Sequence, residues 1–126
     1  MHGTQESIPV AFEQDGVVSR QAAWGEMTVA FERAPAGTDT RPLFRGLPGD
    51  SCQCPHWGYV VSGKMRVIYR DHEEIVGPGE AYYLAPGHNI VCDEAGEVVE
   101  FSPGGEYQKT MHAVAAKMAA HHDQGA

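Results

Sequence analysis

The residues that could do chemistry are concentrated in two short segments of this chain. Residues 52–56 read CQCPH, with two thiols and an imidazole at alternate positions, and residues 86–88 read PGH, with a second imidazole after a tight turn. Thiolate sulfur and imidazole nitrogen are the ligands that zinc and its neighbours prefer. The two segments therefore predict one metal site. Its candidate ligands are Cys52, Cys54, His56 and His88.

The spacing of the first segment restricts how these side chains could share an ion. In a regular strand, Cys52, Cys54 and His56 would point to one face but span about 13 Å at ~3.3 Å per residue. Pro55 removes a ladder hydrogen bond and favours a kink, which would shorten that span. We expect His56 and His88 to form the centre of the site, completed by one or both thiols. The alternative is a ligand cavity without metal, in which His56 is a hydrogen-bonded core histidine.

Cysteine usage supports ligation over disulfide formation. The chain has three cysteines, and a bridge between Cys52 and Cys54 would be strained. In a reducing compartment, close cysteines beside a histidine indicate metal binding or redox chemistry. An oxidation-sensitive thiol site is therefore a further hypothesis. Cys92 is expected to be a buried core thiol.

Two glutamates in the expected strands, Glu32 and Glu100, are assigned to the surface. Glu100 lies between Val99 and Phe101, so it points either to solvent or into the fold. An unpaired buried carboxylate is costly, which favours solvent.

Composition excludes several classes of function. A chain of 126 residues predicts a single domain over 1–126, and 42% hydrophobic with 21% charged residues is typical of a soluble globular protein. The net charge of -8 and the scattered basic residues argue against nucleic-acid binding. Apolar runs fall short of the ~20 residues that a membrane helix needs, and residues 1–20 lack the features of a secretory signal. We expect a cytoplasmic protein with no nucleic-acid or membrane partner.

The pattern along the chain predicts short strands joined by glycine-rich turns. Residues 1–20 suggest an arm or edge strand, and residues 34–50 suggest a long irregular loop. The expected strands are 27–33, 58–61, 64–70, 73–76, 81–84, 89–92 and 98–101. Such spacing indicates an all-β sandwich or barrel. A terminal amphipathic helix is expected over about 107–122, with Met111, Val114, Ala115 and Met118 at helical spacing.

The order of these motifs resembles the cupin superfamily, whose small antiparallel barrel is of the jelly-roll kind. The first cupin motif reads G-x5-H-x-H-x3,4-E-x6-G. Residues 56–63 reproduce its E-x6-G half, with His56 in place of the glutamate. Asp50 and Cys52 stand where the motif has its two histidines, and Cys54 matches none of its ligand positions.

The second cupin motif reads G-x5-P-x-G-x2-H. Gly79 and Gly87 are in register with it, and His88 comes two residues before the motif's histidine. The chain looks most like a subgroup of small cupins with C-x3-H-x-G-Y-V-x2-G followed by P-G-H. The resemblance covers about residues 26–103 and implies an antiparallel cupin jelly-roll barrel with a C-terminal α-helix.

The resemblance implies a metal-binding cupin with a small-molecule pocket. The expected cofactor is a divalent metal, with zinc favoured and iron, nickel or manganese as alternatives. Dioxygenase chemistry is less favoured, since non-haem iron sites usually include a carboxylate and this motif lacks its glutamate. The first hypothesis is a metal-dependent isomerase, lyase or hydrolase acting on a small polar metabolite. The second is a non-catalytic cupin that binds or senses a metal or metabolite.

A homodimer is also expected, from the resemblance and from the exposed edges of an open barrel. Its contacts would come from the N-terminal arm and the terminal helix.

Overall fold

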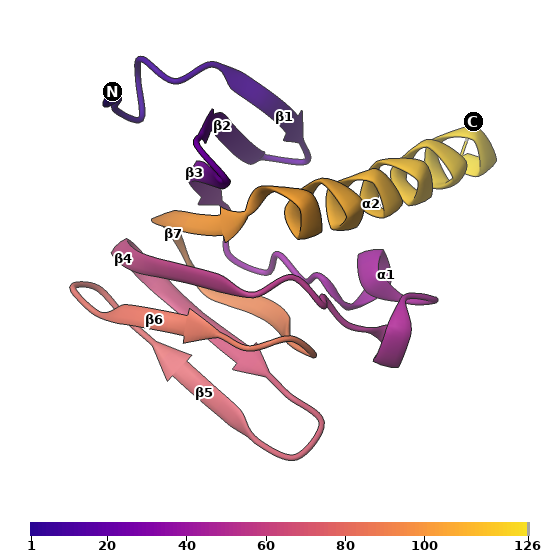
Figure 1. Ribbon diagram of the computed structural model, residues 1–126. Coiled ribbons are helices and arrows are strands. Elements are labelled where there is room, and N and C mark those ends of the chain that lie inside the picture. Colours follow the sequence, from indigo (N-terminus) through magenta and orange to yellow (C-terminus); the bar gives the residue numbers. More distant parts are fainter. Residues whose placement is uncertain (126) are drawn as a thin grey trace.

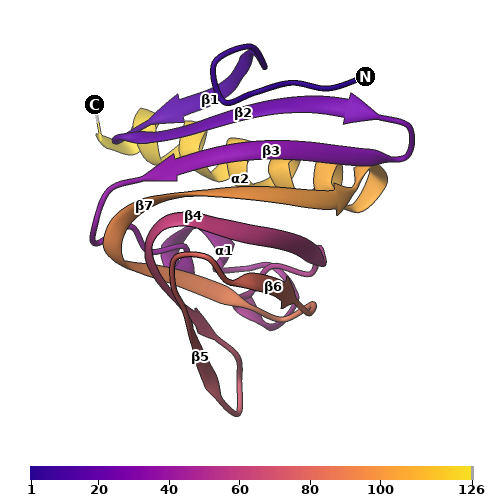
Figure 2. The same ribbon diagram turned by 90° about the vertical axis from the view of Figure 1, so that its left-hand side faces the viewer.

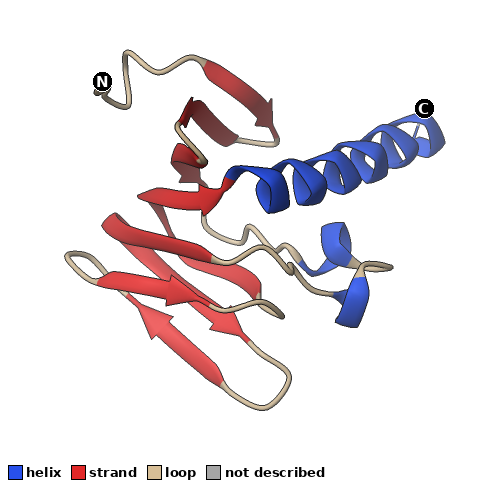
Figure 3. Cartoon of the chain, in the orientation of Figure 1, coloured by secondary structure: helices blue, strands red, loops and turns tan. Residues whose placement is uncertain are grey.

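Seven antiparallel strands form a folded, barrel-like sheet, and a long helix follows the last strand (Figures 1 and 3). The computed structural model describes residues 1–125, and along the final helix it describes side chains as far as Lys117. The strands are β1 (Val10–Gln14), β2 (Val17–Trp24), β3 (Met27–Ala34), β4 (His56–Ile68), β5 (Glu73–Val76), β6 (Ala81–Leu84) and β7 (Asn89–Pro103). The helical elements are α1 (Arg41–Phe44), the 3-10 turn η1 (Pro48–Asp50) and α2 (Gly104–Gly125).

The strand order is β1-β2-β3-β7-β4-β5, and β6 pairs with β4 beside β5. Every pairing is antiparallel. Figure 2 shows β1, β2, β3 and β7 as one layer with α2 running along it, while β4, β5 and β6 curve beneath. The predicted all-β jelly roll with a C-terminal helix is therefore confirmed.

Strands β4 and β7 are longer than expected, because they continue through the places where turns were predicted. At Gly63, with φ +81°, an added Cβ would lie 2.5 Å from the carbonyl oxygen of Ala95, and one at Gly96 would meet the backbone of Ser62. The β4–β7 register shifts in the same region, between Val60 and Met65. The glycines thus allow two strands to bend together at close approach, where the sequence alone suggested two hairpin turns.

The N-terminal part contributes more strand than the resemblance implies. Strands β1 and β2 both precede residue 26, and β1 is an edge of the sheet, as expected for residues 1–20. Within the irregular segment 34–50, α1 and η1 each form a single short turn.

Helix α2 begins at Gly104, three residues before the predicted start. Val114 is buried, Met111 is partly buried and Ala115 is exposed, while the side chain of Met118 lies outside the described residues. No helix among the described residues is long and apolar enough to cross a membrane.

Buried side chains gather in two clusters. One fills the β4–β5–β6 end and includes Val60, Val67 and Leu84. The other joins α2 to the segment that carries the thiols, and its members are Phe44, Cys52, Cys54, Tyr107 and Val114. Helix α2 therefore covers the predicted metal site.

Candidate metal centre

A backbone bridge places Cys52 beside His88. The Cys52 amide donates to the carbonyl oxygen of His88 at 2.9 Å, and the amide of His88 donates back to Cys52 at 3.3 Å. The Gly87 amide also donates to Cys52, at 2.7 Å. Gly87 has φ +98°, a conformation that favours glycine, which explains why a glycine precedes His88 in the PGH turn. The bridge aligns the two predicted segments.

Three of the four predicted ligands come together. Cys52, His56 and His88 each offer one ligating atom, and these atoms all lie within 4.8 Å of one another. Residues 51–55 leave the regular strand, which brings Cys52 Sγ to 3.7 Å from His56 Nε2. The centroids of the two imidazole rings are 5.1 Å apart. An ion bound at ~2.0–2.3 Å from each ligand atom suits a cluster of this size.

Hydrogen bonds on the outer nitrogens orient both imidazoles so that their Nε2 atoms face the centre of the Cys52–His56–His88 trio. His88 Nδ1 donates to the carbonyl oxygen of Ala85 at 2.7 Å, which leaves the lone pair on Nε2. His56 Nδ1 lies 2.6 Å from Ser102 Oγ and 3.7 Å from Glu100 Oε2, so its Nε2 is directed at Cys52. Partners of this kind on the outer ring nitrogen are typical of metal-ligating histidines.

Burial sets the protonation of the trio. It lowers the pKa of His56 and of His88 to about 4, so both imidazoles are neutral at pH 7 and their lone pairs are available. Burial raises the pKa of Cys52 to about 11, so without a cation the thiol keeps its proton. A metal ion would have to displace that proton, as thiol ligation generally requires.

Cys54 lies apart from the trio. Its side chain is 0% exposed, and its thiol donates to the carbonyl oxygen of Pro55 at 3.5 Å. Burial raises its pKa to about 12. Cys92, expected in the core, is partly exposed and lines a cavity that the trio does not line.

The surface assignment of Glu100 was wrong, and that of Glu32 was wrong in part. Glu100 is only 5% exposed and accepts a hydrogen bond from Tyr82 Oη at 2.8 Å. Glu32 is partly buried, and its carboxyl hydrogen-bonds to Ser19 and Glu100. Burial and the carboxyl of Glu100 raise the pKa of Glu32 to about 7, and burial also raises that of Glu100. Hydrogen bonds and a retained proton thus offset the free-energy cost of burying these two carboxyl groups.

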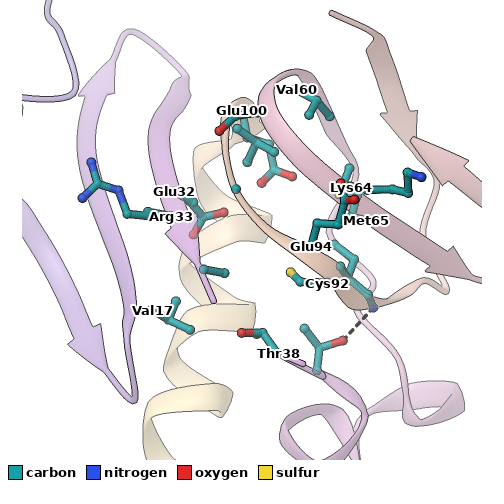
Figure 4. Close-up of a pocket in the computed structure, with 16 residues that line it drawn as sticks. Val17, Glu32, Arg33, Thr38, Val60, Lys64, Met65, Cys92, Glu94 and Glu100 are labelled. Atoms are coloured by element: carbon teal, nitrogen blue, oxygen red, sulfur yellow. Dashed lines mark hydrogen bonds between the residues drawn. The ribbon is translucent and has the colours of Figure 1, made fainter. Parts of the chain in front are cut away.

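Glu32 and Glu100 line a cavity of about 160 Å³ between β3, β4 and β7 (Figure 4). Apolar side chains dominate its wall, including those of Val60, Met65 and Val98. None of the three trio residues is among those that line it.

One signal for these carboxyls was present in the sequence. In β3, the alternation places Val29 and Phe31 on one face and Thr28, Ala30 and Glu32 on the other. In the structure both faces of this part of β3 are buried, since Val29 is 1% exposed and Ala30 is 1% exposed. The expectation of a half-buried strand therefore placed Glu32 on the surface, although its face is also enclosed.

Comparisons with known proteins identify the fold. No protein-family model and no curated protein matches the chain. A solved RmlC-like cupin from Shewanella frigidimarina is 16% identical, covering 80% of this chain and 88% of that one with a TM-score of 0.59. The polyketide cyclase RemF from Streptomyces resistomycificus is 16% identical, and the match covers 82% of this chain and 79% of that chain with a TM-score of 0.61. KdgF from a Halomonas species is 18% identical, and the match covers 79% of this chain and 90% of that chain with a TM-score of 0.55. At these identities the likeness establishes the cupin fold, and the fold alone.

Proposed function

We propose that this cupin-fold chain binds one divalent metal ion through Cys52, His56 and His88, beside a cavity that accepts a small molecule. The observation that carries the proposal is the buried trio itself, with one ligating atom from each residue inside a 4.8 Å cluster. The sequence also suggested Cys54 as a ligand. Cys54 is not a member of this cluster, and its thiol donates to the carbonyl oxygen of Pro55, which supports three protein ligands over four.

Zinc is the ion we favour. One thiolate and two neutral imidazoles are a borderline-soft donor set that suits zinc, and iron, nickel or manganese would be poorer matches to the sulfur.

Three protein ligands support an enzyme. A tetrahedral zinc ion held by three side chains keeps a position for water or substrate, whereas structural sites are usually closed by four. Bound there, the ion would supply Lewis acidity or an activated water, which suits isomerase, lyase or hydrolase chemistry on a small metabolite. Cupin folds can host catalysis, as the neighbour named a polyketide cyclase illustrates.

A non-catalytic role is supported by a different observation. His56 directs Nε2 toward Cys52 and Nδ1 toward Ser102 and Glu100, and Glu100 lines the cavity. A molecule in this cavity would therefore contact Glu100, a neighbour of His56 Nδ1, and would not contact the trio itself. In that arrangement the metal ion would stabilise the ligand site or change its affinity, as in a sensing protein.

Elemental analysis of untagged protein tests metal binding. We expect about one zinc ion per chain in the wild type and the loss of most of it in Cys52→Ala, His56→Ala and His88→Ala. Cys54→Ala and Cys92→Ala are the matched controls and should keep the ion. Metal-free wild-type protein after zinc loading would reject the proposal. Loss of zinc in Cys54→Ala with folding intact would restore Cys54 as a ligand.

The coordination shell distinguishes the two roles. X-ray absorption at the zinc edge should show one sulfur and two imidazoles, and the fourth ligand decides between the hypotheses. An exchangeable oxygen supports the enzyme, and a fourth protein ligand supports binding or sensing.

The expected homodimer and the cytoplasmic location remain proposals. Exposed aromatic residues on the outer face of the sheet support self-association. They are Trp57, Tyr59, Tyr83 and Phe101.

A further inference from the structure

The barrel cavity contains two carboxyl groups on neighbouring strands. Glu32 of β3 pairs with Val98 of β7, and Glu100 lies two residues further along β7, on the same face. Diagonal neighbours of this kind are close enough for long side chains to touch, and the two carboxyls hydrogen-bond to each other. The cavity therefore has a two-carboxyl acceptor site on one wall.

No basic side chain neutralises this pair within the part of the chain that the structure describes. Two basic residues line the cavity: Arg33 pairs with Glu97 at 2.8 Å, and Lys64 is exposed and forms no ion pair with Glu32 or Glu100. Among the described residues, the one side-chain nitrogen in ion-pair range of Glu100 is Nδ1 of His56, at 3.7 Å, and this nitrogen already faces Ser102 Oγ at 2.6 Å. Tyr82 and Ser19 supply neutral hydrogen bonds.

The rest of the wall sets the size and polarity of an occupant. At about 160 Å³, the cavity is close to the ~150 Å³ space that holds one benzene molecule. Val60, Met65 and Val98 contribute apolar surface, while Thr38 and Thr40 add hydroxyls that are hydrogen-bonded to the backbone of Pro35 and Ile90. A pocket that is mostly apolar with a few convergent polar groups is the usual form of a small-molecule site.

We propose that this cavity binds a small primary amine, with its ammonium group on the Glu32–Glu100 carboxyl pair and its apolar body against Val60, Met65 and Val98. An ammonium group offers three donors and a positive charge to acceptors that no basic side chain satisfies. Because the two carboxyls hydrogen-bond to each other, they share one proton and keep acceptor oxygens with one negative charge, which would reject an anion of the same shape. This inference rests on the proposed function for the existence of a ligand site, and it names the ligand class.

Binding of three matched probes tests the proposal. Isobutylamine, isobutanol and isovalerate share a branched apolar body and differ in the charge of the head group. Calorimetric titration of the full-length protein should give at least a tenfold tighter dissociation constant for the amine than for the alcohol, and no measurable binding of the carboxylate. Equal affinity for amine and alcohol would overturn the proposal.

Two variants assign the site. Glu32→Gln should weaken amine binding at least tenfold, whereas Glu94→Gln, the same change at an exposed position on the cavity rim, should leave it unchanged. Val17→Phe fills the cavity from β2 and should abolish binding of amine and alcohol alike. Amine binding that survives both Glu32→Gln and Val17→Phe would place the amine elsewhere and overturn the proposal.

Failure of this proposal and failure of the metal proposal are separable. Titrations are repeated on zinc-loaded protein and on His88→Ala. Retained amine affinity in His88→Ala assigns binding to the carboxyl pair whatever the metal content, and an affinity that disappears with the zinc would assign the amine to the metal and refute the carboxyl site.

Discussion

His56 has different neighbours on its two ring nitrogens, and this arrangement links the two proposed sites of the barrel. Nε2 faces the thiol of Cys52, while Nδ1 faces Ser102 at 2.6 Å and Glu100 at 3.7 Å. With an ion on Nε2, the proton resides on Nδ1 and donates to Ser102. The orientation of the ring therefore depends on residues of β7 that do not touch the ion.

Replacing Ser102 with alanine should weaken metal binding without removing a ligand. Loss of the Nδ1 partner frees the ring to rotate and lowers its basicity, and such outer partners are worth roughly 10–100-fold in metal affinity. Competition with a chromophoric chelator measures the change. Ser62→Ala, the same substitution at an exposed position of β4, is the control. Equal zinc affinity in both variants would show that Ser102 does not position His56.

Glu32 should make stability fall as the pH rises. Its pKa is about 7 in the folded protein against an ordinary value of 4.5, so between these values the folded state holds a proton that the unfolded state has released. Stability from this group is complete below pH 4.5 and is lost toward pH 7. Glu32→Gln lacks this dependence, so its free energy of unfolding relative to wild type should rise by roughly 1–3 kcal/mol between pH 4.5 and 7.5.

Urea denaturation at several pH values measures that difference. Glu94→Gln, at an exposed site, should show no such trend. A constant difference between Glu32→Gln and wild type across the pH range would mean that Glu32 is ionised in the folded protein.

At the scale of single residues, three of the four residues that the sequence suggested as ligands cluster in the structure, whereas the carboxyl pair was missed. Cys52, His56 and His88 stand out because thiols and imidazoles near proline and glycine are uncommon in ordinary strands. Cys54 could not be separated from Cys52, since the bend after Cys52 depends on pairing with His88, which is distant in sequence. Glu100 looked too costly to bury and Glu32 was placed on the surface, because the hydrogen-bond partners of both come from other strands.

At the scale of elements, Gly58 explains how Tyr82 reaches Glu100. Gly58 of β4 pairs with Tyr82 of β6 on one side and with Glu100 of β7 on the other. A Cβ at this position would collide with the Tyr82 ring and lie 2.7 Å from the carbonyl oxygen of Val99. The missing side chain allows the ring to cross β4 and donate to Glu100 at 2.8 Å.

Gly58→Ala should therefore destabilise the barrel and displace Tyr82. Overpacking of this kind costs about 1–3 kcal/mol, and the loss of the hydrogen bond to a buried carboxyl adds to it. Chemical denaturation measures the effect. The control is Gly105→Ala in the first turn of α2, where an added Cβ meets no atom within 4 Å. A Gly58→Ala protein as stable as Gly105→Ala would contradict this account of the motif glycine.

The sequence predicted the elements of the second half of the chain in type and order, since alternation and glycine-rich turns are local signals. It misplaced the middle of β4 and β7, where Gly63 and Gly96 looked like turns. A glycine that ends a strand and a glycine that lets two strands approach at a bend give the same local pattern. Only the opposing strand, more than thirty residues away, distinguishes them.

At the scale of the whole molecule, helix α2 and the thiols of the candidate metal site are parts of one buried cluster. Tyr107 and Val114 of α2 pack with Phe44 and with both thiol residues, and Gln21 of β2 donates to Tyr107 Oη at 2.7 Å. The segment between β3 and β4 has little regular structure of its own. It is held by the helix on one side and, in our proposal, by the ion that joins Cys52 to His88.

Removing the ion should therefore lower the stability of the folded chain. A ligand that binds only the folded state at 100 times its dissociation constant stabilises it by about 2.7 kcal/mol, which corresponds to a rise in Tm on the order of 10 °C for a domain of this size. Thermal denaturation with and without a chelator should show that difference in the wild type and in Cys54→Ala. His88→Ala should melt at the same temperature under both conditions. A chelator effect that persists in His88→Ala would locate the stabilising ion outside the trio, and no effect in zinc-loaded wild type would mean that the barrel and α2 hold this segment without it.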